Sequence, residues 1–168
     1  MSKTRGGPAA VLHEELSELI ASGVDIYVAT RDAALVPESM LAMGLKAHAD
    51  RCGMSVYLPK ACAVRTLENL KDNGQIAITL TRPSDHKAVQ LKGRVRQIRE
   101  SGPSDRELQA VHRAALVEQF AMVGVPRGAT RRLVWWPSIA VEVELENVFT
   151  QTPGPHAGEP IERGRAEE

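Results

Sequence analysis

The chain has few cysteines, few aromatic residues and no excess charge, and these shortages exclude several classes of protein. Its 168 residues include only two cysteines, Cys52 and Cys62, and 4% aromatic residues. Two cysteines with no CxxC pair and no histidine at ligand spacing form neither a disulfide framework nor a zinc motif. The 21 basic and 21 acidic residues cancel, so no net field attracts nucleic acid or a membrane surface. We therefore expect a reduced, cytoplasmic protein with no nucleic-acid and no membrane partner.

Long hydrophobic runs are also missing. No segment approaches the about 20 apolar residues of a membrane span, and the first residues, MSKTRGGPAAVLHEEL, contain no apolar core of signal-peptide length. The 43% hydrophobic and 25% charged residues are typical of a globular protein, and the length is that of one domain. We expect a flexible tail over 1–8, a folded domain over 9–152 and an extended or disordered tail over 153–168.

Hydrophobic periodicity predicts the order of the elements. We expect helices over 12–21, 64–73 and 105–123, and strands over 24–30, 38–49, 55–58, 75–81, a segment after residue 87 and 139–149. Ser104–Glu107 has the pattern of a capping box, and Val125–Gly128 is expected to end that helix. The nearly continuous apolar residues of 40–49 are typical of a strand that is buried on both faces, as at a subunit contact.

Residues 58–96 collect groups that bind oxyanions. Arg65 and Thr66 lie just inside the start of the expected helix 64–73, where free backbone N–H groups and the helix dipole favour an anion. Lys60 precedes them, and the turn Arg82–Lys87 between two expected strands is dense in hydrogen-bond donors. This segment therefore predicts a site that anchors a phosphate group.

These features resemble the FMN-binding split-barrel proteins of the pyridoxamine 5'-phosphate oxidase-like family. The resemblance is carried by VATRDAALVPE, LENLKDNGQIAITLTRP, QLKGRV and FTQTPGPHAG, and by the order of the elements over roughly residues 10–155. It implies a mainly β (α+β) fold, a split β-barrel of about six to seven antiparallel strands with flanking helices. It also implies a homodimer that binds FMN in grooves between its subunits.

The resemblance also implies which residues bind the cofactor. In that family a Ser-Arg-Lys run at the start of the helix grips the phosphate, and the matching positions here are Val64, Arg65 and Thr66. The expected cofactor-binding set is Lys60, Arg65, Thr66, Arg82, Ser84, His86, Lys87 and Gln90, with no metal ligand and no catalytic residue assigned. The alternatives are a solvated surface charge for Arg65, an ordinary polar turn for His86 and Lys87, and a solvent-facing side chain for Gln90.

Two departures from the family pattern limit the inferred function. Family members commonly carry a basic residue on the second long strand, and Ser39–Met43 has none. The Arg-x-His type run of the true oxidases has no counterpart in Ala140–Gln151, so oxidation of pyridoxamine phosphate itself is not expected. We expect an FMN-dependent oxidoreductase acting on a small molecule. The alternatives are a flavin or haem carrier or sensor without turnover, a deazaflavin protein, or a structural dimer with a vacant pocket.

Two apolar features predict dimerisation. On a monomer, the run Met40–Leu45 and the pair Trp135 and Trp136 would leave an exposed patch of a size that soluble proteins rarely tolerate. We expect them to form an interface above about 2,000 Å². The two tryptophans either seal a core or interface, or one of them lies over the flavin. Nucleic-acid binding through Arg94, Arg96 and Arg99 is disfavoured, because the net charge is zero and no aromatic residues are interleaved.

Overall fold

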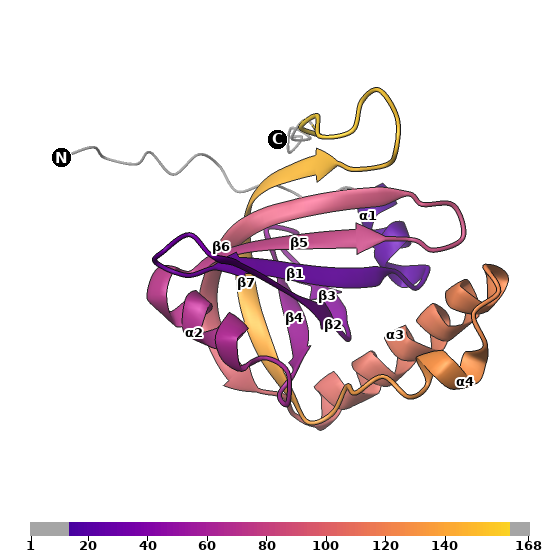
Figure 1. Ribbon diagram of the computed structural model, residues 1–168, viewed down its shortest axis with the longest axis horizontal. Helices are drawn as coiled ribbons and strands as arrows, with labels where there is room; N and C mark the ends of the chain where they lie inside the picture. Colours follow the sequence, from indigo (N-terminus) through magenta and orange to yellow (C-terminus); the bar gives the residue numbers. More distant parts are fainter. Residues whose placement is uncertain (1–13, 162–168) are drawn as a thin grey trace.

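The structure is a computed structural model that describes residues 14–161 (Figure 1). Within these residues, seven strands form one antiparallel sheet in the order β2-β1-β5-β6-β7-β4-β3, and four helices flank it. The strands are β1 (Asp25–Arg31), β2 (Pro37–Ala42), β3 (Leu45–Ala47), β4 (Gly53–Pro59), β5 (Gln75–Thr81), β6 (Ala88–Glu100) and β7 (Ser138–Thr150). The helices are α1 (Glu14–Ala21), α2 (Val64–Asn73), α3 (Pro103–Met122) and α4 (Arg127–Thr130). The predicted mainly β split barrel with flanking helices is confirmed.

The two longest strands, β6 and β7, connect the two halves of the sheet. Each has 13 residues, and β5 pairs with the first half of β6 while β4 pairs with the first half of β7. The β6–β7 register shifts between Lys92 and Gly93 and again between Val95 and Gln97. Such bulges bend and twist a strand. A Cβ on Gly93 would lie 2.2 Å from the carbonyl oxygen of Glu144, so this close approach requires glycine.

Alternating side chains fill the interior of the curled sheet. Ile26 and Val28 of β1, and Ile78 and Leu80 of β5, are fully buried, while the residues between them are partly or fully exposed. All seven residues of β4 are buried, because one face joins the core and the other lies under α3, as the hydrogen bond from Tyr57 to Asp105 shows.

The expected strand over 38–49 is wrong, because the chain breaks into β2 and β3 at Met43 and Gly44. The Met43 N–H donates to the Tyr57 carbonyl (2.9 Å) and the Tyr57 N–H donates to the Gly44 carbonyl (3.0 Å). A Cβ on Gly44 would lie 2.9 Å from Cγ of Gln109 on α3. The segment thus crosses from the β1 edge of the sheet to the β4 edge, where α3 packs closely against it.

This crossing also overturns the expected apolar patch. Met40, Ala42, Met43 and Leu45 are each at most 9% exposed within a single chain, because the segment is covered by the barrel interior and by α3. These four buried residues therefore give no argument for a dimer. The dimer itself remains a prediction.

The start of α3 also differs from the expectation. Gly102 is its N-cap, and the Asp105 carboxylate accepts a hydrogen bond from the Gly102 N–H (2.8 Å). The predicted capping box at Ser104–Glu107 is therefore wrong, since Asp105 holds the third helical position. The helix ends at Met122, one residue before its expected end, and the segment expected only to end it also starts the short helix α4. Within residues 14–161, no helix is both long and apolar enough to cross a membrane.

The C-terminal segment turns back along β7. The Thr150 N–H donates to the Glu159 carbonyl (3.0 Å), and the Ile161 N–H donates to the Val148 carbonyl (2.9 Å). The predicted tail over 1–8 and the end of the predicted tail, 162–168, lie outside the described residues. The domain boundaries at 8 and 152 therefore stay predictions.

Candidate functional site

Helix α2 has the boundaries that the sequence predicts. It begins at Val64 and ends before Gly74, which has the left-handed φ of 67° that favours glycine. Its N-cap, Ala63, makes no side-chain capping hydrogen bond within the described chain. Thr66 is fully buried, and its hydroxyl has no hydrogen-bond partner among the described residues. The first turn of α2 thus retains donor capacity, which suits an anion.

Arg65 lies at this turn between two carboxylates. Its Nε is 3.1 Å from Oε2 of Glu38, and its Nη2 is 3.5 Å from Oδ2 of Asp32. The Arg65 side chain is 51% exposed. Glu38 belongs to β2, the strand on which the sequence lacks the family's basic residue. That strand instead presents a carboxylate to Arg65, and an incoming phosphate would compete with it.

Lys60 has a partner elsewhere. Its Nζ is 2.6 Å from Oε1 of Glu100 at the end of β6, and both side chains are more than half exposed. The second positive charge expected beside Arg65 is therefore held by a surface carboxylate in this structure.

The turn between β5 and β6 is organised around Asp85. Arg82 donates to both carboxylate oxygens of Asp85 (2.9 and 2.5 Å), and the Lys87 N–H donates to Oδ1 (3.1 Å). These contacts, Arg82 first, lower the pKa of Asp85 to about 2. Ser84 and His86 are exposed, and His86 has a φ of 58°. The Arg82 charge is therefore already paired within the turn.

Gln90 has the orientation that the sequence predicts. It lies on the face of β6 opposite to the buried Val89 and Leu91, and its Nε2 donates to Oγ1 of Thr79 on β5 (3.3 Å). It contacts the neighbouring strand and remains half-exposed.

The structure divides the predicted site residues into two groups. Arg65 and Thr66 belong to α2, which leads into the first residue of β5, whereas the turn Arg82–Lys87 follows the last residue of β5 (Figure 1). Seven strand residues separate the groups by about 20 Å. A single chain therefore does not bring the two groups together.

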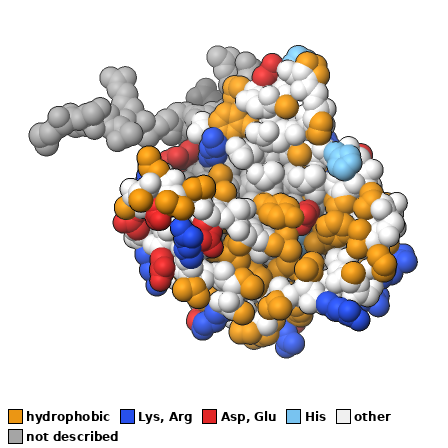
Figure 2. All heavy atoms as spheres, viewed as in Figure 1, with side chains coloured by type: hydrophobic (Ala, Val, Ile, Leu, Met, Phe, Trp, Pro, Cys, Tyr) orange, Lys and Arg blue, Asp and Glu red, His pale blue; other side chains and the backbone are white. Residues whose placement is uncertain are grey.

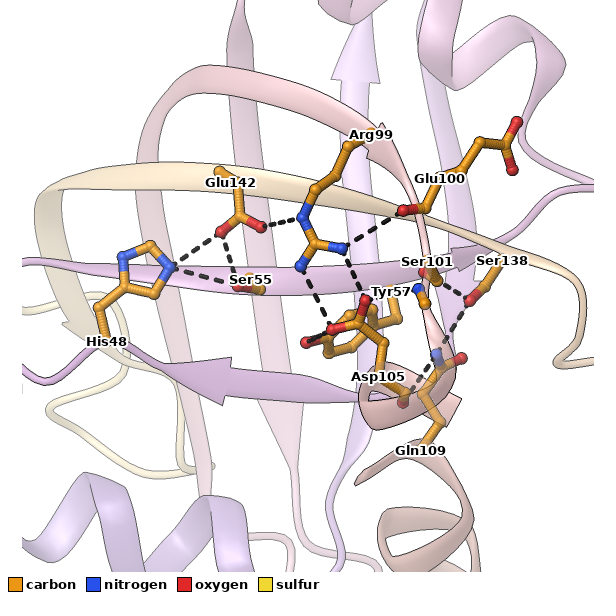
Figure 3. A network of polar contacts seen from close by, with 11 residues as sticks. His48, Ser55, Tyr57, Arg99, Glu100, Ser101, Asp105, Gln109, Ser138 and Glu142 are labelled. Carbon is orange, nitrogen blue, oxygen red and sulfur yellow. Dashed lines mark hydrogen bonds and ion pairs between the residues drawn. The ribbon is translucent and has the colours of Figure 1, made fainter. Parts of the chain in front are cut away.

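A polar network that the sequence analysis missed lies between the sheet and the first turn of α3 (Figure 3). Arg99 of β6 contacts both oxygens of Asp105 (2.6 and 3.2 Å) and, through Nε, Glu142 of β7 (3.1 Å). The buried Tyr57 hydroxyl also donates to Asp105 (2.8 Å). The network thus joins β4, β6 and β7 to the first turn of α3.

These contacts shift the pKa values of the groups involved. The hydrogen bonds from Arg99, Gly102 and Tyr57 lower the pKa of Asp105 to about 2, against the opposing effect of burial. Burial first, and then Asp105, raise the pKa of Tyr57. Asp105 is therefore ionised and Tyr57 protonated at neutral pH, and the network serves to anchor α3.

The network continues to His48, the residue after β3. The Ser55 hydroxyl donates to Oε2 of Glu142 (2.6 Å), and Nε2 of His48 lies 2.9 Å from the same oxygen. A cleft of about 240 Å³ opens beside it, lined by His48, Asp50, Cys52, Gly53, Arg96, Glu142, Val143 and Glu144. Ser55 is buried and hydrogen-bonded to a carboxylate, so it is not placed as an exposed nucleophile.

The cysteines and other potential ligands form no metal centre in the described part of the chain. Cys52 and Cys62 are both free. Within residues 14–161, no group of three or more His, Cys, Asp or Glu side chains is placed to hold a metal ion.

The curled seven-stranded sheet, with α2 between β4 and β5, is the split-barrel fold of the pyridoxamine 5'-phosphate oxidase-like proteins. No family model matches the sequence, and no curated protein matches it. Solved structures do. HupZ of Group A Streptococcus is 19% identical, with a TM-score of 0.55 over 88% of this chain and 100% of that chain.

Two further structures are similar to this chain. A putative pyridoxamine 5'-phosphate oxidase from Lactobacillus delbrueckii is 17% identical, with a TM-score of 0.53 over 83% of this chain and 93% of that chain. An F420 reductase is 13% identical, with a TM-score of 0.52 over 82% of this chain and 98% of that chain. Likeness at these identities shows the fold, and function has to be argued from the site.

Proposed function

We propose that this chain binds FMN as a homodimer and transfers electrons between the flavin and a small molecule. The observation that carries the proposal is the first turn of α2, where Arg65 stands beside an N-terminus that has no side-chain cap. A guanidinium and helix N–H groups together suit a phosphate dianion. Bound FMN would supply the hydride chemistry, and the protein would supply position and hydrogen-bond donors.

The residues at this turn fit a phosphate, although one neighbouring carboxylate opposes it. Arg65 is half-exposed, and its contact with Asp32 is long, so exchanging that carboxylate for a phosphate costs little. Glu38 is closer and less exposed, and its negative charge opposes the phosphate. We therefore expect FMN to bind, with Glu38 weakening the affinity.

The separation of the two predicted groups supports the homodimer. Arg65 and the turn Arg82–Lys87 lie at opposite ends of β5, so both serve one FMN only if each comes from a different subunit. An uncharged row, Leu41–Tyr27–Thr79–Gln90, crosses the outer face of β2, β1, β5 and β6. Tyr27 is 47% exposed, and hydrophobic side chains gather around a hollow in the middle of the face seen in Figure 2. Sedimentation at micromolar concentration tests this, since a monomer would contradict it.

Substitution of Arg65 tests the phosphate anchor. Arg65→Ala should weaken FMN binding by about 2 kcal/mol, the scale of a charge-assisted hydrogen bond, and leave riboflavin binding unchanged because riboflavin has no phosphate. Titration by flavin fluorescence measures both. Arg127→Ala is the matched control, because Arg127 is equally exposed (55%) and also pairs with a carboxylate. An equal loss for FMN and riboflavin would place Arg65 away from the phosphate.

A structural dimer with a vacant pocket is the second candidate, and the two carboxylates beside Arg65 favour it. The absorbance spectrum of the purified protein, with and without added FMN, separates the candidates. Protein that stays colourless with FMN, even after Glu38→Gln, supports the vacant pocket. Yellow protein that neither NADH nor NADPH reduces supports a carrier or sensor.

A further inference from the structure

The surface formed by α3, α4 and the segment that follows carries an unbalanced positive charge. Residues 103–137 contain five arginines but only three carboxylates, Asp105, Glu107 and Glu118. Asp105 is bound by Arg99, and Glu118 is bound by Arg127 (3.0 and 2.6 Å). Within the described chain, the other four arginines form no ion pair with a carboxylate: Arg106, Arg113, Arg131 and Arg132. Figure 2 shows basic side chains at the lower right, in the region where Figure 1 places α4.

Two half-buried tryptophans hold two of these arginines. The rings of Trp135 and Trp136 are 6.1 Å apart. The Arg106 guanidinium lies 5.7 and 5.5 Å from their centroids, and that of Arg113 lies 4.7 Å from Trp135. Stacking fixes a guanidinium by its face and leaves the N–H groups at its edge available. We call these six residues, the four arginines and two tryptophans, the Arg-Trp surface.

Arg113 is the least solvated of these cations. It is half-buried, burial lowers its pKa, and one N–H donates to the Arg131 carbonyl (3.0 Å). The remaining N–H groups of Arg113 have no carboxylate within ion-pair distance among the described residues. A partly desolvated cation without a counter-ion favours an anionic ligand.

A cleft lies between Arg113 and Arg131. Its volume is about 400 Å³, within the usual range of small-molecule sites. Ala110, Ala114 and Val117 of α3 supply a floor of small apolar side chains. Such a floor accepts a flat ring, while the two guanidiniums at the sides accept phosphate oxygens in two-pronged contacts.

We propose that this cleft binds a nucleotide, with its ring over Ala110 and Ala114 and its phosphates on Arg113 and Arg131. The cleft is separate from the FMN anchor at Arg65, which is on α2. It favours a small ligand over a nucleic-acid strand, because a strand needs many cations along its phosphates and the chain as a whole has no net charge. On β6, Arg99 is bound by Asp105 and Glu142, and Arg94 and Arg96 are paired with Glu146 and Glu144.

Tryptophan fluorescence offers a direct measurement, because both tryptophans of the chain belong to this surface. Added ADP should change the tryptophan emission of the flavin-free protein, and the change should saturate as the ADP concentration rises. ADP should bind at least tenfold more tightly than adenosine, which lacks the phosphates, and than pyrophosphate, which lacks the ring. Isothermal calorimetry gives the same affinities without relying on the tryptophans.

Matched variants separate the cleft from the rest of the molecule. Arg131→Gln should weaken ADP binding at least tenfold, because it removes one of the two guanidiniums that hold the phosphates. Arg131 is exposed, so we expect the variant to fold normally. Arg94→Gln on β6 and Arg65→Ala on α2 should leave ADP binding unchanged. The Arg65 variant also keeps this proposal distinct from FMN binding, since either site can be lost while the other still binds its ligand.

Three kinds of result would overturn the proposal. The first is the absence of saturable ADP binding at millimolar concentration, or equal binding by Arg131→Gln. The second is pyrophosphate binding as tightly as ADP, which would show that the cleft binds anions without recognising the ring. The third is an oligothymidylate that binds tenfold more tightly than ADP, which would assign the surface to nucleic acid.

Discussion

Arg65 and Arg99 each lie between two carboxylates, yet the two arrangements differ in what they permit. Arg65 is 51% exposed and makes two contacts, of 3.1 and 3.5 Å. Arg99 is 37% exposed, and its partners Asp105 and Glu142 are only 11% and 16% exposed. Asp105 also accepts hydrogen bonds from Tyr57 and Gly102. A solvated pair with few supporting contacts can exchange a partner, whereas a network that is satisfied on every side holds the fold.

The comparison explains why charge alone does not locate a binding site. Both arginines are cations near helix starts, since Arg65 is on the first turn of α2 and Arg99 contacts the first turn of α3. Of the two, Arg65 has a partner held by one long contact, Asp32 at 3.5 Å, that a phosphate can replace. The candidate anchor at Arg65 differs from the network at Arg99 in whether a phosphate can replace a carboxylate partner. The presence of a cation does not distinguish them.

Removal of Arg99 should give the largest effect. Arg99→Ala leaves the Asp105 and Glu142 carboxylates poorly solvated without their cation, so we expect the free energy of unfolding to fall by about 3 kcal/mol. Arg65→Ala is the matched comparison, and its loss should stay below about 1 kcal/mol because the pair is solvated. Urea denaturation measures both. Equal losses would remove the distinction between the two arginines.

The acid stability of the protein should depend on Asp105. Its pKa falls from the usual 3.8 to about 2 on folding, so the unfolded chain takes up this proton first as the pH decreases. The stabilisation is therefore complete above about pH 4 and is lost towards pH 2, by about 2 kcal/mol. Denaturation of Asp105→Asn between pH 5 and 2 should show a smaller loss.

Glu38→Gln is the control for this pH dependence. It removes a carboxylate from the Arg65 pair and should keep the loss that Asp105 causes. Part of the loss should also remain in Asp105→Asn, because Asp85 has a lowered pKa as well. An unchanged profile in Asp105→Asn would show that Arg99 does not hold Asp105 in solution.

The smallest of these effects should be that of Glu38→Gln on FMN binding. Removing the carboxylate 3.1 Å from Arg65 frees the guanidinium. We expect FMN affinity to rise about threefold, in line with the modest energy of a pair whose arginine is half-exposed. Fluorescence titration with FMN measures it. Glu144→Gln, which removes the partner of Arg96, should leave the affinity unchanged. A lower affinity in Glu38→Gln would mean that Glu38 orients Arg65 for the phosphate.

Local patterns predicted much of the fold. The strand Gln75–Thr81 and the helix Val64–Asn73 have the expected ends, because alternation, helical spacing and the Asn73–Gly74 stop are all local signals. The break at Met43 and Gly44 was missed, because an apolar run buried on both faces has the same composition whether another subunit or the chain's own α3 covers it.

The network around Arg99 could not be predicted in the same way. Glu142, Glu144 and Glu146 alternate with apolar residues, which is typical of a solvent-facing side of a strand. Glu142 meets Arg99 only through the β6–β7 register, 43 residues away in the chain. The capping pattern did place Asp105 near the start of a helix. It was the one local sequence signal for a member of this network. The separation of the site residues into two groups likewise follows from β5 lying between them.

The order of strands in the sheet also sets when the protein can fold during its synthesis. β4 lies between β3 and β7, and Leu58 pairs with Ile139. A ribosome that adds 5–20 residues per second needs about 4 to 16 s to reach that partner. Until then the apolar β4 belongs at most to a two-stranded hairpin, which is marginally stable in water. The nascent chain thus carries an aggregation-prone segment until β7 emerges, and any product truncated before Ser138 keeps it.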